Sequence, residues 1–231
     1  MNNLYDLIED NDSFLVIYKK PNTNFHSEDG QTGLFETVKR HQGLQELYPV
    51  HRLDKVTSGI LVMAKTASVN HELVEQFKNR QVEKYYLAVS NKKPKKKQGL
   101  IKGDMESARR GAWKLSNTQQ NPAITQFVSG FMEEGKRLFI IKPHTGKTHQ
   151  IRVALKSLGA PIMGDLLYAD TQTCVGVDRV YLHAYSLLFS VGGRSYRFTE
   201  LPREGKDFLS PTFCSTFEEF AKPWELTWPK V

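Results

Sequence analysis

The feature that most constrains the fold of this chain is a series of short apolar segments of strand length, separated by turn residues. Each segment is rich in apolar, β-branched or aromatic residues, which is typical of strands buried on at least one face. The last four segments form two pairs that are joined through Gly135 and through Gly192-Gly193, as is typical of β-hairpins. We therefore expect seven strands, at 14–17, 59–65, 82–90, 124–131, 137–142, 181–191 and 195–201.

Only a few segments show helical spacing of apolar residues. The clearest follows Thr66, a good N-cap, and repeats Val69, Leu73 and Phe77 on one face. We expect helices at 31–42, 67–80 and 148–158. Because strands outnumber helices and strict β-α-β alternation is absent, the pattern predicts an α+β fold with a mixed, mostly antiparallel sheet that is flanked by helices and loops.

Composition narrows the class of protein further. No apolar run approaches the roughly 18 residues of a transmembrane helix, and the polar, acidic segment 1–12 does not resemble a signal peptide. The two cysteines, Cys174 and Cys214, form no CxxC pair, and the seven histidines form no HExxH pattern. We therefore expect a cytoplasmic protein with no membrane contact and no metal site. Without a repeat or a convincing linker, we expect a single domain over residues 1–231.

The net charge of +7 and the pI near 9.3 favour a polyanionic partner, and nucleic acid is the first candidate. The densest cationic run, 92–97, must be solvated. It forms either a loop that contacts phosphates or a loop that only aids solubility. The pair Arg109-Arg110 and the residue Lys147 are further candidates for phosphate contacts.

One segment, 50–59, places Asp54 between the cations Arg52 and Lys55 and ends with small hydroxyl residues and Gly59. In one interpretation this is a surface loop in which Asp54 forms a turn or pairs with Arg52. In the other, Asp54 is a positioned carboxylate that neighbouring positive charge keeps ionised, and it is available as a nucleophile.

A second segment, 142–152, brings cations and histidines to the start of the last predicted helix. Cations at a helix N-terminus oppose the helix dipole, at a cost of roughly 0.3–1 kcal/mol each. This placement favours a negative partner, which is either a phosphate or a carboxylate such as Asp54. The alternative is a basic helix end that is only solvated.

The third segment is Lys84-Tyr85-Tyr86, within a predicted strand. Neighbouring residues of a strand point to opposite faces, so the two rings cannot share one side. Either one ring belongs to the core and the other is exposed, or one of them stacks on a nucleobase.

Together these motifs resemble the RluA family of RNA pseudouridine synthases. HRLDKVTSGILVMAKT at 51–66 is similar to the family pattern HRLDxxTSGxxxxAK, KYY at 84–86 to KxY, and PHTGKTHQIRV at 143–153 to PxTGRTHQ(I/L)RVH. Three weaker matches are YKKP at 18–21, PIMGD at 161–165 with Tyr168, and LHA at 182–184. The resemblance covers about residues 12–202 and leaves an aromatic-rich tail at 203–231.

The resemblance implies a pseudouridine synthase fold and an isomerase, an intramolecular transferase that converts uridine in structured rRNA or tRNA to pseudouridine. No cofactor or metal is implied, and we expect a monomer. The family's catalytic aspartate falls on Asp54, its active-site tyrosine on Tyr86 and its conserved basic residue on Arg152. Arg152 is expected to orient Asp54, and Tyr86 to stack on the base or relay a proton.

Substrate contacts are implied for a further set of residues. Because a stacked base is out of reach, the target nucleotide must be flipped out, and the resemblance assigns its support to Arg52. Four more residues are expected to contact substrate, namely Thr57, Lys147, His149 and Gln150. The attack of Asp54 on the sugar or on the base, the RNA involved and the role of the tail stay open.

This chain departs from the family patterns in three places. Asn22-Thr23 replaces the early glycine, Lys147 replaces the arginine of TGR, and Ala154 replaces the histidine after RV. The change to lysine keeps the charge but loses bidentate phosphate geometry. None of the three departures falls on Asp54, Tyr86 or Arg152.

Two other functions are less consistent with the sequence. A catalytically silent RNA-binding protein on the same fold is disfavoured, since all three implied catalytic residues are present. A phosphoryl-transfer enzyme or nuclease would need a carboxylate cluster for Mg²⁺ or a P-loop, and the sequence has neither. The chain also begins almost directly with the catalytic motifs, so we expect no S4-like RNA-binding domain.

Overall fold

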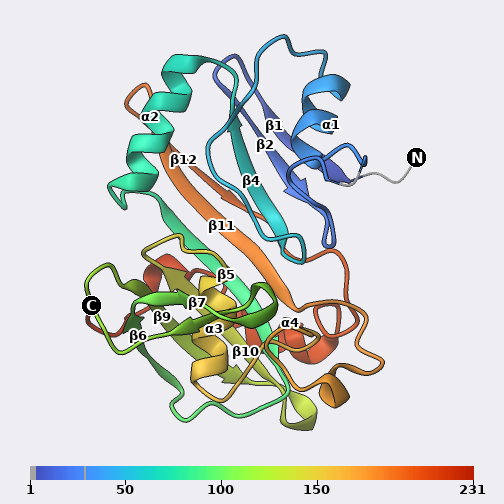
Figure 1. Cartoon of the computed structure of the whole chain (residues 1–231), viewed down its shortest axis with the longest axis vertical. Helices are drawn as coiled ribbons and strands as arrows, with labels where there is room; N and C mark the ends of the chain where they lie inside the picture. Colours follow the sequence, from blue (N-terminus) through green and yellow to red (C-terminus); the bar gives the residue numbers. More distant parts are fainter. Residues whose placement is uncertain (1–3, 29) are drawn as a thin grey trace. The chain divides into compact units, whose positions relative to one another are not determined.

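The computed structural model describes residues 4–28 and 30–231 of the chain (Figure 1). They form two compact units. Unit 1 comprises Met1–Lys84 and Ala184–Leu201, and unit 2 comprises Tyr85–His183 and Pro202–Val231. No helix among the described residues is long and apolar enough to cross a membrane.

Unit 1 is built on an antiparallel arrangement of strands around the fully buried strand β2. Strand β2 lies between β1 and β4, with Phe14 opposite Ala64 in the register, and β11 follows β4 and pairs with β12. The strands are β1 (Tyr5–Asp10), β2 (Phe14–Lys19), β3 (Tyr48–Pro49), β4 (Ser58–Ala64), β11 (Leu182–Val191, of which unit 1 holds the part from Ala184) and β12 (Arg194–Thr199).

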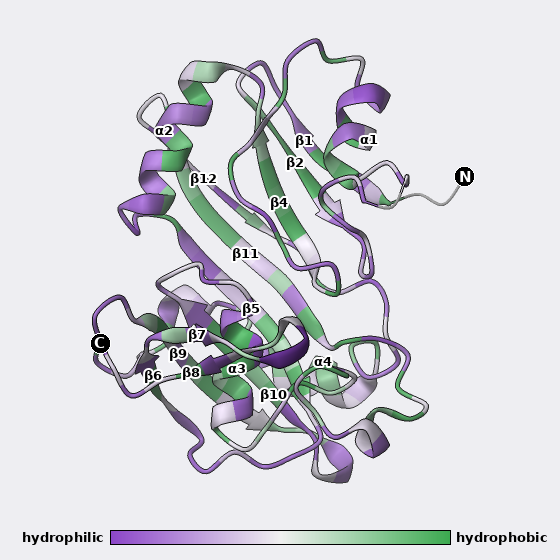
Figure 2. Ribbon diagram, in the orientation of Figure 1, coloured by the Kyte–Doolittle hydropathy of each residue, from purple (hydrophilic) through white to green (hydrophobic). Residues whose placement is uncertain are grey.

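Two helices, α1 (Leu34–His41) and α2 (Ala67–Lys78), belong to the same unit. The Thr66 hydroxyl accepts a hydrogen bond from the Val69 N–H and caps α2, as its sequence predicts. The core of unit 1 is strongly apolar, and most of β2 and β4 is drawn as hydrophobic in Figure 2. Its buried members are Phe14, Val16, Ile60, Val62, Ala64, Leu73, Val82, Leu187, Phe189 and Val191.

Unit 2 contains a second set of antiparallel strands in the order β5, β10, β9, β6. They are β5 (Glu83–Ser90, in unit 2 from Tyr85), β6 (Gln98–Gly103), β9 (Ala123–Phe131) and β10 (Arg137–Pro143). A separate two-stranded hairpin is formed by β7 (Met105–Ser107) and β8 (Trp113–Leu115).

The helices of unit 2 are α3 (Gln150–Ser157) and α4 (Pro211–Glu218). Helix α3 ends at Ser157 with Leu158 as its C-cap, and Gly159 follows with φ +74°, the left-handed conformation that a glycine adopts without strain. Four short 3₁₀ segments complete the chain: η1 (Arg109–Gly111), η2 (Glu133–Gly135), η3 (Thr171–Cys174) and η4 (Pro223–Glu225).

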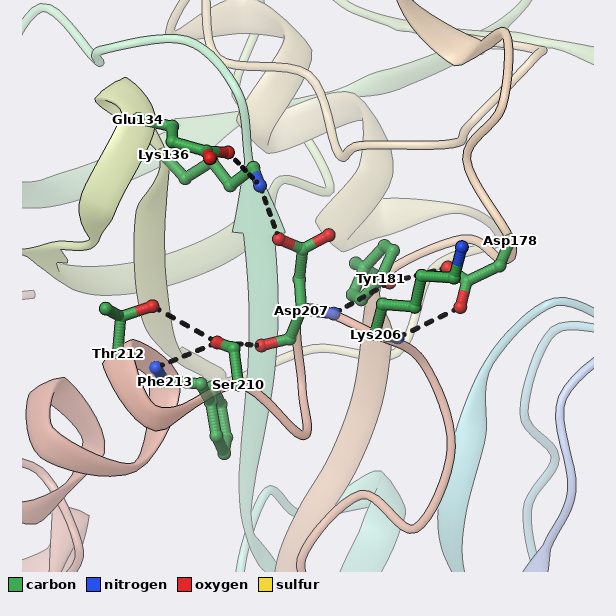
Figure 3. A network of polar contacts seen from close by, with 9 residues as sticks. All are labelled: Glu134, Lys136, Asp178, Tyr181, Lys206, Asp207, Ser210, Thr212 and Phe213. Carbon is green, nitrogen blue, oxygen red and sulfur yellow. Dashed lines mark hydrogen bonds and ion pairs between the residues drawn. The ribbon is translucent and has the colours of Figure 1, made fainter.

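A polar network holds the segment before α4 to the rest of unit 2 (Figure 3). The Asp207 carboxylate pairs with the Lys136 ammonium at 2.6 Å, and the Asp207 N–H donates to the Tyr181 hydroxyl. That hydroxyl donates to the Asp178 carboxylate. The pKa of Tyr181 is raised mainly by burial and, to a smaller extent, by this hydrogen bond. The Ser210 hydroxyl donates to the Asp207 carbonyl and caps α4.

The expected α+β class with mostly antiparallel pairing is confirmed, as are all seven predicted strands and all three predicted helices, with ends that differ by a few residues. Strands β1, β3, β6, β7 and β8 and helix α4 were not predicted. The lysines at 92–97 are exposed, as expected of a solvated run. Of the acidic segment 1–12, residues 1–3 lie outside the described residues.

Candidate active site

In unit 1, Asp54 stands at the start of a tight turn that leads into β4. The Thr57 N–H donates to the Asp54 carbonyl at 3.0 Å, which closes the turn over four residues. Leu53 and Thr57 are buried, whereas Asp54 is half-buried and Arg52 is exposed. The turn therefore has buried residues on both sides of Asp54, and the exposed Arg52 lies two residues before it.

A fully buried lysine, Lys19 at the end of β2, holds this turn from beneath. Its ammonium donates to the carbonyls of Thr57 at 2.7 Å, Lys55 at 3.0 Å and Lys20 at 3.0 Å. A buried ammonium is stable only when its N–H groups find acceptors, and these three carbonyls supply them. The backbone on the C-terminal side of Asp54 is thus held by charge-assisted hydrogen bonds.

On the N-terminal side the turn is anchored by His51. Its Nε2 accepts a hydrogen bond from the Val62 N–H at 3.2 Å, and its ring stacks on Phe77 with centroids 4.7 Å apart. Burial, and then the charge of Lys84, lower the His51 pKa to about 3. His51 is therefore neutral at physiological pH, as an acceptor to a backbone N–H requires.

The glycine of the TSG triplet has a clear packing role. Gly59 adopts φ +114°, and a Cβ at this position would collide with the Ala184 carbonyl oxygen of β11. Only glycine permits this close approach of β4 and β11 directly after the turn.

In unit 2, the pair Tyr85-Tyr86 behaves as strand alternation predicts. Tyr85 is buried, with its ring centroid 6.5 Å from that of Trp224 and 5.9 Å from that of Trp228. Tyr86 is half-buried and faces the opposite way. The core role thus belongs to Tyr85, which also explains how the two tryptophans of the C-terminal tail pack back on the body.

The cationic start of α3 has a carboxylate partner within unit 2. Arg152 donates from Nε and Nη2 to the two oxygens of Asp165, at 2.7 and 2.8 Å. Both side chains are buried, and this bidentate pairing fixes the plane of the guanidinium. Gly164, at φ +81°, leads into Asp165 where a Cβ would collide with the Arg179 carbonyl oxygen.

Tyr168 completes this cluster. Its hydroxyl is hydrogen-bonded to His149 Nδ1 at 2.8 Å, and its ring lies 5.0 Å from the Arg152 guanidinium carbon. His149 precedes α3 with φ +57°, a left-handed conformation that is uncommon for a non-glycine residue. The ring of His149 is thereby held beside the first turn of α3.

Gln150 shapes the loop before α3. Its Oε1 accepts from the Thr145 hydroxyl and the Lys147 N–H, at 2.7 and 3.0 Å. Its Nε2 donates to the Ile124 carbonyl and the Thr125 hydroxyl. This buried amide therefore fixes the backbone that presents Lys147.

The predicted site residues are divided between the two units. Arg52, Asp54 and Thr57 lie in unit 1, and Tyr86, Lys147, His149, Gln150 and Arg152 lie in unit 2. Lys19, Asp165 and Tyr168 were not predicted as site residues, although each lies in one of the segments that resemble the family. Residues 4–28 and 30–231 contain no group of three or more His, Cys, Asp or Glu side chains that could hold a metal ion.

Residues 13–157 match the family model described as RNA pseudouridylate synthase. The chain belongs to this family. Within it, the chain is 46% identical over 220 residues to an uncharacterized RNA pseudouridine synthase of Haemophilus influenzae, in a match that covers 95% of this chain and 97% of that protein. It is 34% identical over 151 residues to the dual-specificity RNA pseudouridine synthase RluA of Escherichia coli, in a match that covers 62% of this chain and 69% of RluA.

The fold is also shared with a solved structure. Human RNA pseudouridylate synthase domain containing 1 superposes with a TM-score of 0.71 over 85% of this chain and 82% of its own, at 24% identity. The pseudouridine synthase fold is thus confirmed. Pseudouridine synthases isomerise uridine in RNA, so the chain is an RNA-modifying isomerase of the RluA-like group and RNA is its partner.

Proposed function

We propose that this pseudouridine synthase acts on specific uridines of structured rRNA or tRNA, with Asp54 as the nucleophile. The observation that carries the proposal is the anchoring of the Asp54 turn, with the Lys19 ammonium on one side and neutral His51 on the other. A carboxylate whose backbone is held in this way, beside an exposed arginine, is preorganised to attack.

The reaction needs the target nucleotide outside the RNA stack, and we assign the support of the flipped nucleotide to Arg52, whose side chain is exposed. Asp54 attacks either the sugar or the base, and the bond from C1′ to N1 breaks. The base then rotates, a bond forms from C1′ to C5, and the bond between Asp54 and the nucleotide breaks. The proton of C5 leaves and N1 gains one, so the product is an isomer of the substrate.

Two residues of unit 2 serve the same reaction in this proposal. Tyr86, which is half-buried on the face opposite Tyr85, stacks on the target base and relays a proton. Arg152, whose guanidinium plane is fixed by Asp165, supplies a second, directed positive charge for the Asp54 carboxylate or for a phosphate. We propose that both units together form one catalytic domain.

The remaining substrate contacts are assigned by position. Lys147 and His149 lie just before the start of α3 and are only partly buried, so part of each side chain is exposed and can contact RNA. Gln150 acts through the loop that it shapes, and Thr57 through the turn that it closes. The two unpaired cysteines fit a reducing compartment, so we further propose a cytoplasmic enzyme. We also propose that it works as a monomer.

The test is Asp54→Asn, which keeps the shape of the side chain and removes the nucleophile. We expect no pseudouridine in transcripts of tRNA and large-subunit rRNA, with RNA affinity retained. Asp12→Asn is the matched control, because Asp12 is a carboxylate of the same unit that lies outside the Asp54 turn. Substantial turnover by Asp54→Asn would reject the assignment, whereas loss of turnover in Asp12→Asn would show that the assay reports on something other than the nucleophile.

A further inference from the structure

Residues 223–231 of unit 2, which we call the tryptophan segment, lie outside residues 13–157, the part of the chain that matches the family model. The segment begins with η4, and Trp228 folds back on this turn, because its indole N–H donates to the Pro223 carbonyl at 2.8 Å. The rings of Trp224 and Trp228 are half-buried. The segment is therefore an ordered part of unit 2, and the proposed chemistry does not explain it.

The tryptophan segment packs on a row of side chains that crosses three neighbouring strands. Gln126 of β9 lies opposite Lys142 of β10 in the register, and the Lys142 ammonium lies 5.3 Å from the centre of the Tyr85 ring of β5. Both tryptophan rings of the segment lie against Tyr85 at one end of this row. At the other end, Nε2 of Gln126 donates to the Pro229 carbonyl. Both ends of the row are thus tied to the segment.

Gln126 also ties the segment to the loop that precedes α3. Because the Pro229 carbonyl can only accept, the amide nitrogen of Gln126 faces it, and the amide oxygen faces His144. The His144 Nε2 therefore carries a proton and donates to that oxygen at 2.6 Å. Thr145 follows His144 directly, and its hydroxyl donates to Gln150 within the same loop.

The opposite face of these strands carries residues of the candidate site. Successive residues of a strand point to opposite faces, so Thr125 and Tyr86 face away from the row of Gln126 and Tyr85. The Thr125 hydroxyl accordingly accepts a hydrogen bond from Gln150 of α3 at 2.9 Å. The strands are thus held between the tryptophan segment on one face and the start of α3 with Tyr86 on the other.

We propose that the tryptophan segment positions the active site from the opposite face of the sheet. It fixes Tyr86 through the neighbouring Tyr85, and it fixes the loop before α3 through Gln126. This inference rests on the proposed function, because it needs Tyr86 and that loop to serve catalysis. Gln126 and Trp228 are positioning residues, and a looser ring or loop costs rate because reacting groups must be held in a narrow range of geometry.

The first experiment uses Gln126→Leu, which nearly keeps the size of the side chain and removes the donor to the Pro229 carbonyl. With transcripts of tRNA and large-subunit rRNA, we expect turnover at saturating RNA to fall about tenfold, and RNA affinity to stay unchanged. Two of the three tryptophans lie in the segment, so its release should shift the tryptophan emission to longer wavelength. The matched control is Gln98→Leu, at an exposed glutamine of the adjacent strand β6, and it should change neither turnover nor emission.

The second experiment keeps Gln126 and alters Trp228, whose ring is only half-buried. Trp228→Ala removes the contact with Tyr85 and should lower the turnover at saturating RNA by a similar factor. Trp228→Phe keeps an aromatic ring against Tyr85 and should restore most of the turnover. The control is Leu209→Ala, at an exposed leucine of the same unit, and it should leave the turnover unchanged.

Two results would overturn the proposal. Wild-type turnover at saturating RNA in Gln126→Leu or in Trp228→Ala would show that the segment only stabilises the fold. Weaker RNA binding with wild-type turnover at saturation would make the segment an RNA-binding surface instead. Both comparisons take the wild-type rate as their reference, whichever residue is the nucleophile. An active Asp54→Asn enzyme would therefore reject the proposed nucleophile and leave this test intact.

Discussion

Arg152 and Asp165 form a bidentate pair, with Nε and Nη2 of the arginine 2.7 and 2.8 Å from the two carboxylate oxygens. The exposed fractions of the two side chains are 7% and 1%, so the pair is almost completely shielded from solvent. A buried guanidinium near a helix start would be unfavourable without such a partner. Asp165 therefore makes the placement of Arg152 possible, and it also fixes the direction in which the remaining N–H groups point.

Removing one partner of this pair should be costly. We expect Asp165→Asn to lower the free energy of unfolding by about 3–5 kcal/mol, because it leaves Arg152 buried without its carboxylate. Chemical denaturation measures this, with the exposed Asp170→Asn as a control of smaller effect. A decrease of less than about 1 kcal/mol would mean that other groups of the protein already compensate the arginine.

The buried ammonium of Lys19 should matter for turnover more than for RNA affinity. Lys19→Met removes the donor to the Thr57 and Lys55 carbonyls, which costs about 1–3 kcal/mol of stability and loosens the turn that carries Asp54. We expect the rate at saturating RNA to drop while binding persists, since Lys19 is shielded from solvent. The control is Lys39→Met, at a half-exposed lysine of the same unit, and it should change neither the stability nor the rate at saturating RNA. Unchanged turnover in a folded Lys19→Met would contradict the role.

The lowered pKa of His51 predicts that stability decreases in acid. The pKa of His51 is about 3 in the folded chain and 6.5 ordinarily. Between these two pH values the unfolded chain therefore binds a proton at His51 that the folded chain does not bind. His51 therefore contributes stability above pH 6.5, and this contribution shrinks as the pH falls toward 3. Between pH 7 and pH 5 the decrease is at most about 2 kcal/mol.

The histidine contribution can be isolated with His51→Gln, whose amide oxygen can still accept from the Val62 N–H. Denaturation at pH 7 and pH 5 gives, for each protein, the change in the free energy of unfolding between the two pH values. The contributions of all other titrating groups are the same in both proteins, so they cancel when the two changes are compared. The wild type should be destabilised more than the variant. Equal decreases would show that His51 is protonated in the folded state in this range.

The lysine run at 92–97 is exposed, and we expect its lysines to bind phosphates of the RNA. Replacing its lysines by alanine should weaken RNA binding and reduce the salt slope by about 0.7–0.9 for each phosphate that is no longer neutralised. Saturated turnover should stay nearly intact, because phosphate contacts of this kind supply affinity and take no part in the chemical step. A wild-type slope after the replacement would leave the lysines only a role in solubility.

Arg52 is expected to behave in the opposite way. If it supports the flipped nucleotide, Arg52→Ala should reduce turnover by orders of magnitude and alter RNA affinity little. Single-turnover kinetics separate the two effects. A variant that binds poorly yet turns over normally at saturation would place Arg52 among the phosphate-binding residues instead.

Local patterns in the sequence predicted the central strands well. The turn between β11 and β12 follows from Gly192 and Gly193, which adopt φ 57° and 78° as a tight hairpin requires. Strand β1 escaped prediction because three of its six residues are acidic, and only Tyr5 within it is buried. The β7–β8 hairpin escaped because its strands are three residues long and lack a continuous apolar face.

The sequence predicted those parts of the site that depend on residues close together in the chain. Motif spacing identified the Asp54 turn, and helix electrostatics predicted an anion for the cationic start of α3. The identity of that anion depends on tertiary folding, which brings Asp165 to Arg152; a contact between Asp54 and Arg152 stays a prediction. Lys19 was missed because a lysine at a strand end is usually exposed, and only the carbonyls that surround its ammonium explain its burial.

The central claim, that Asp54 makes pseudouridine at specific uridines, is tested most directly by mapping pseudouridines in total RNA from three strains. One strain lacks the gene, one carries it, and one carries Asp54→Asn at the same protein level. We predict at least one rRNA or tRNA uridine that is modified only in the strain with the intact gene. Modification at that position in the Asp54→Asn strain would contradict the account.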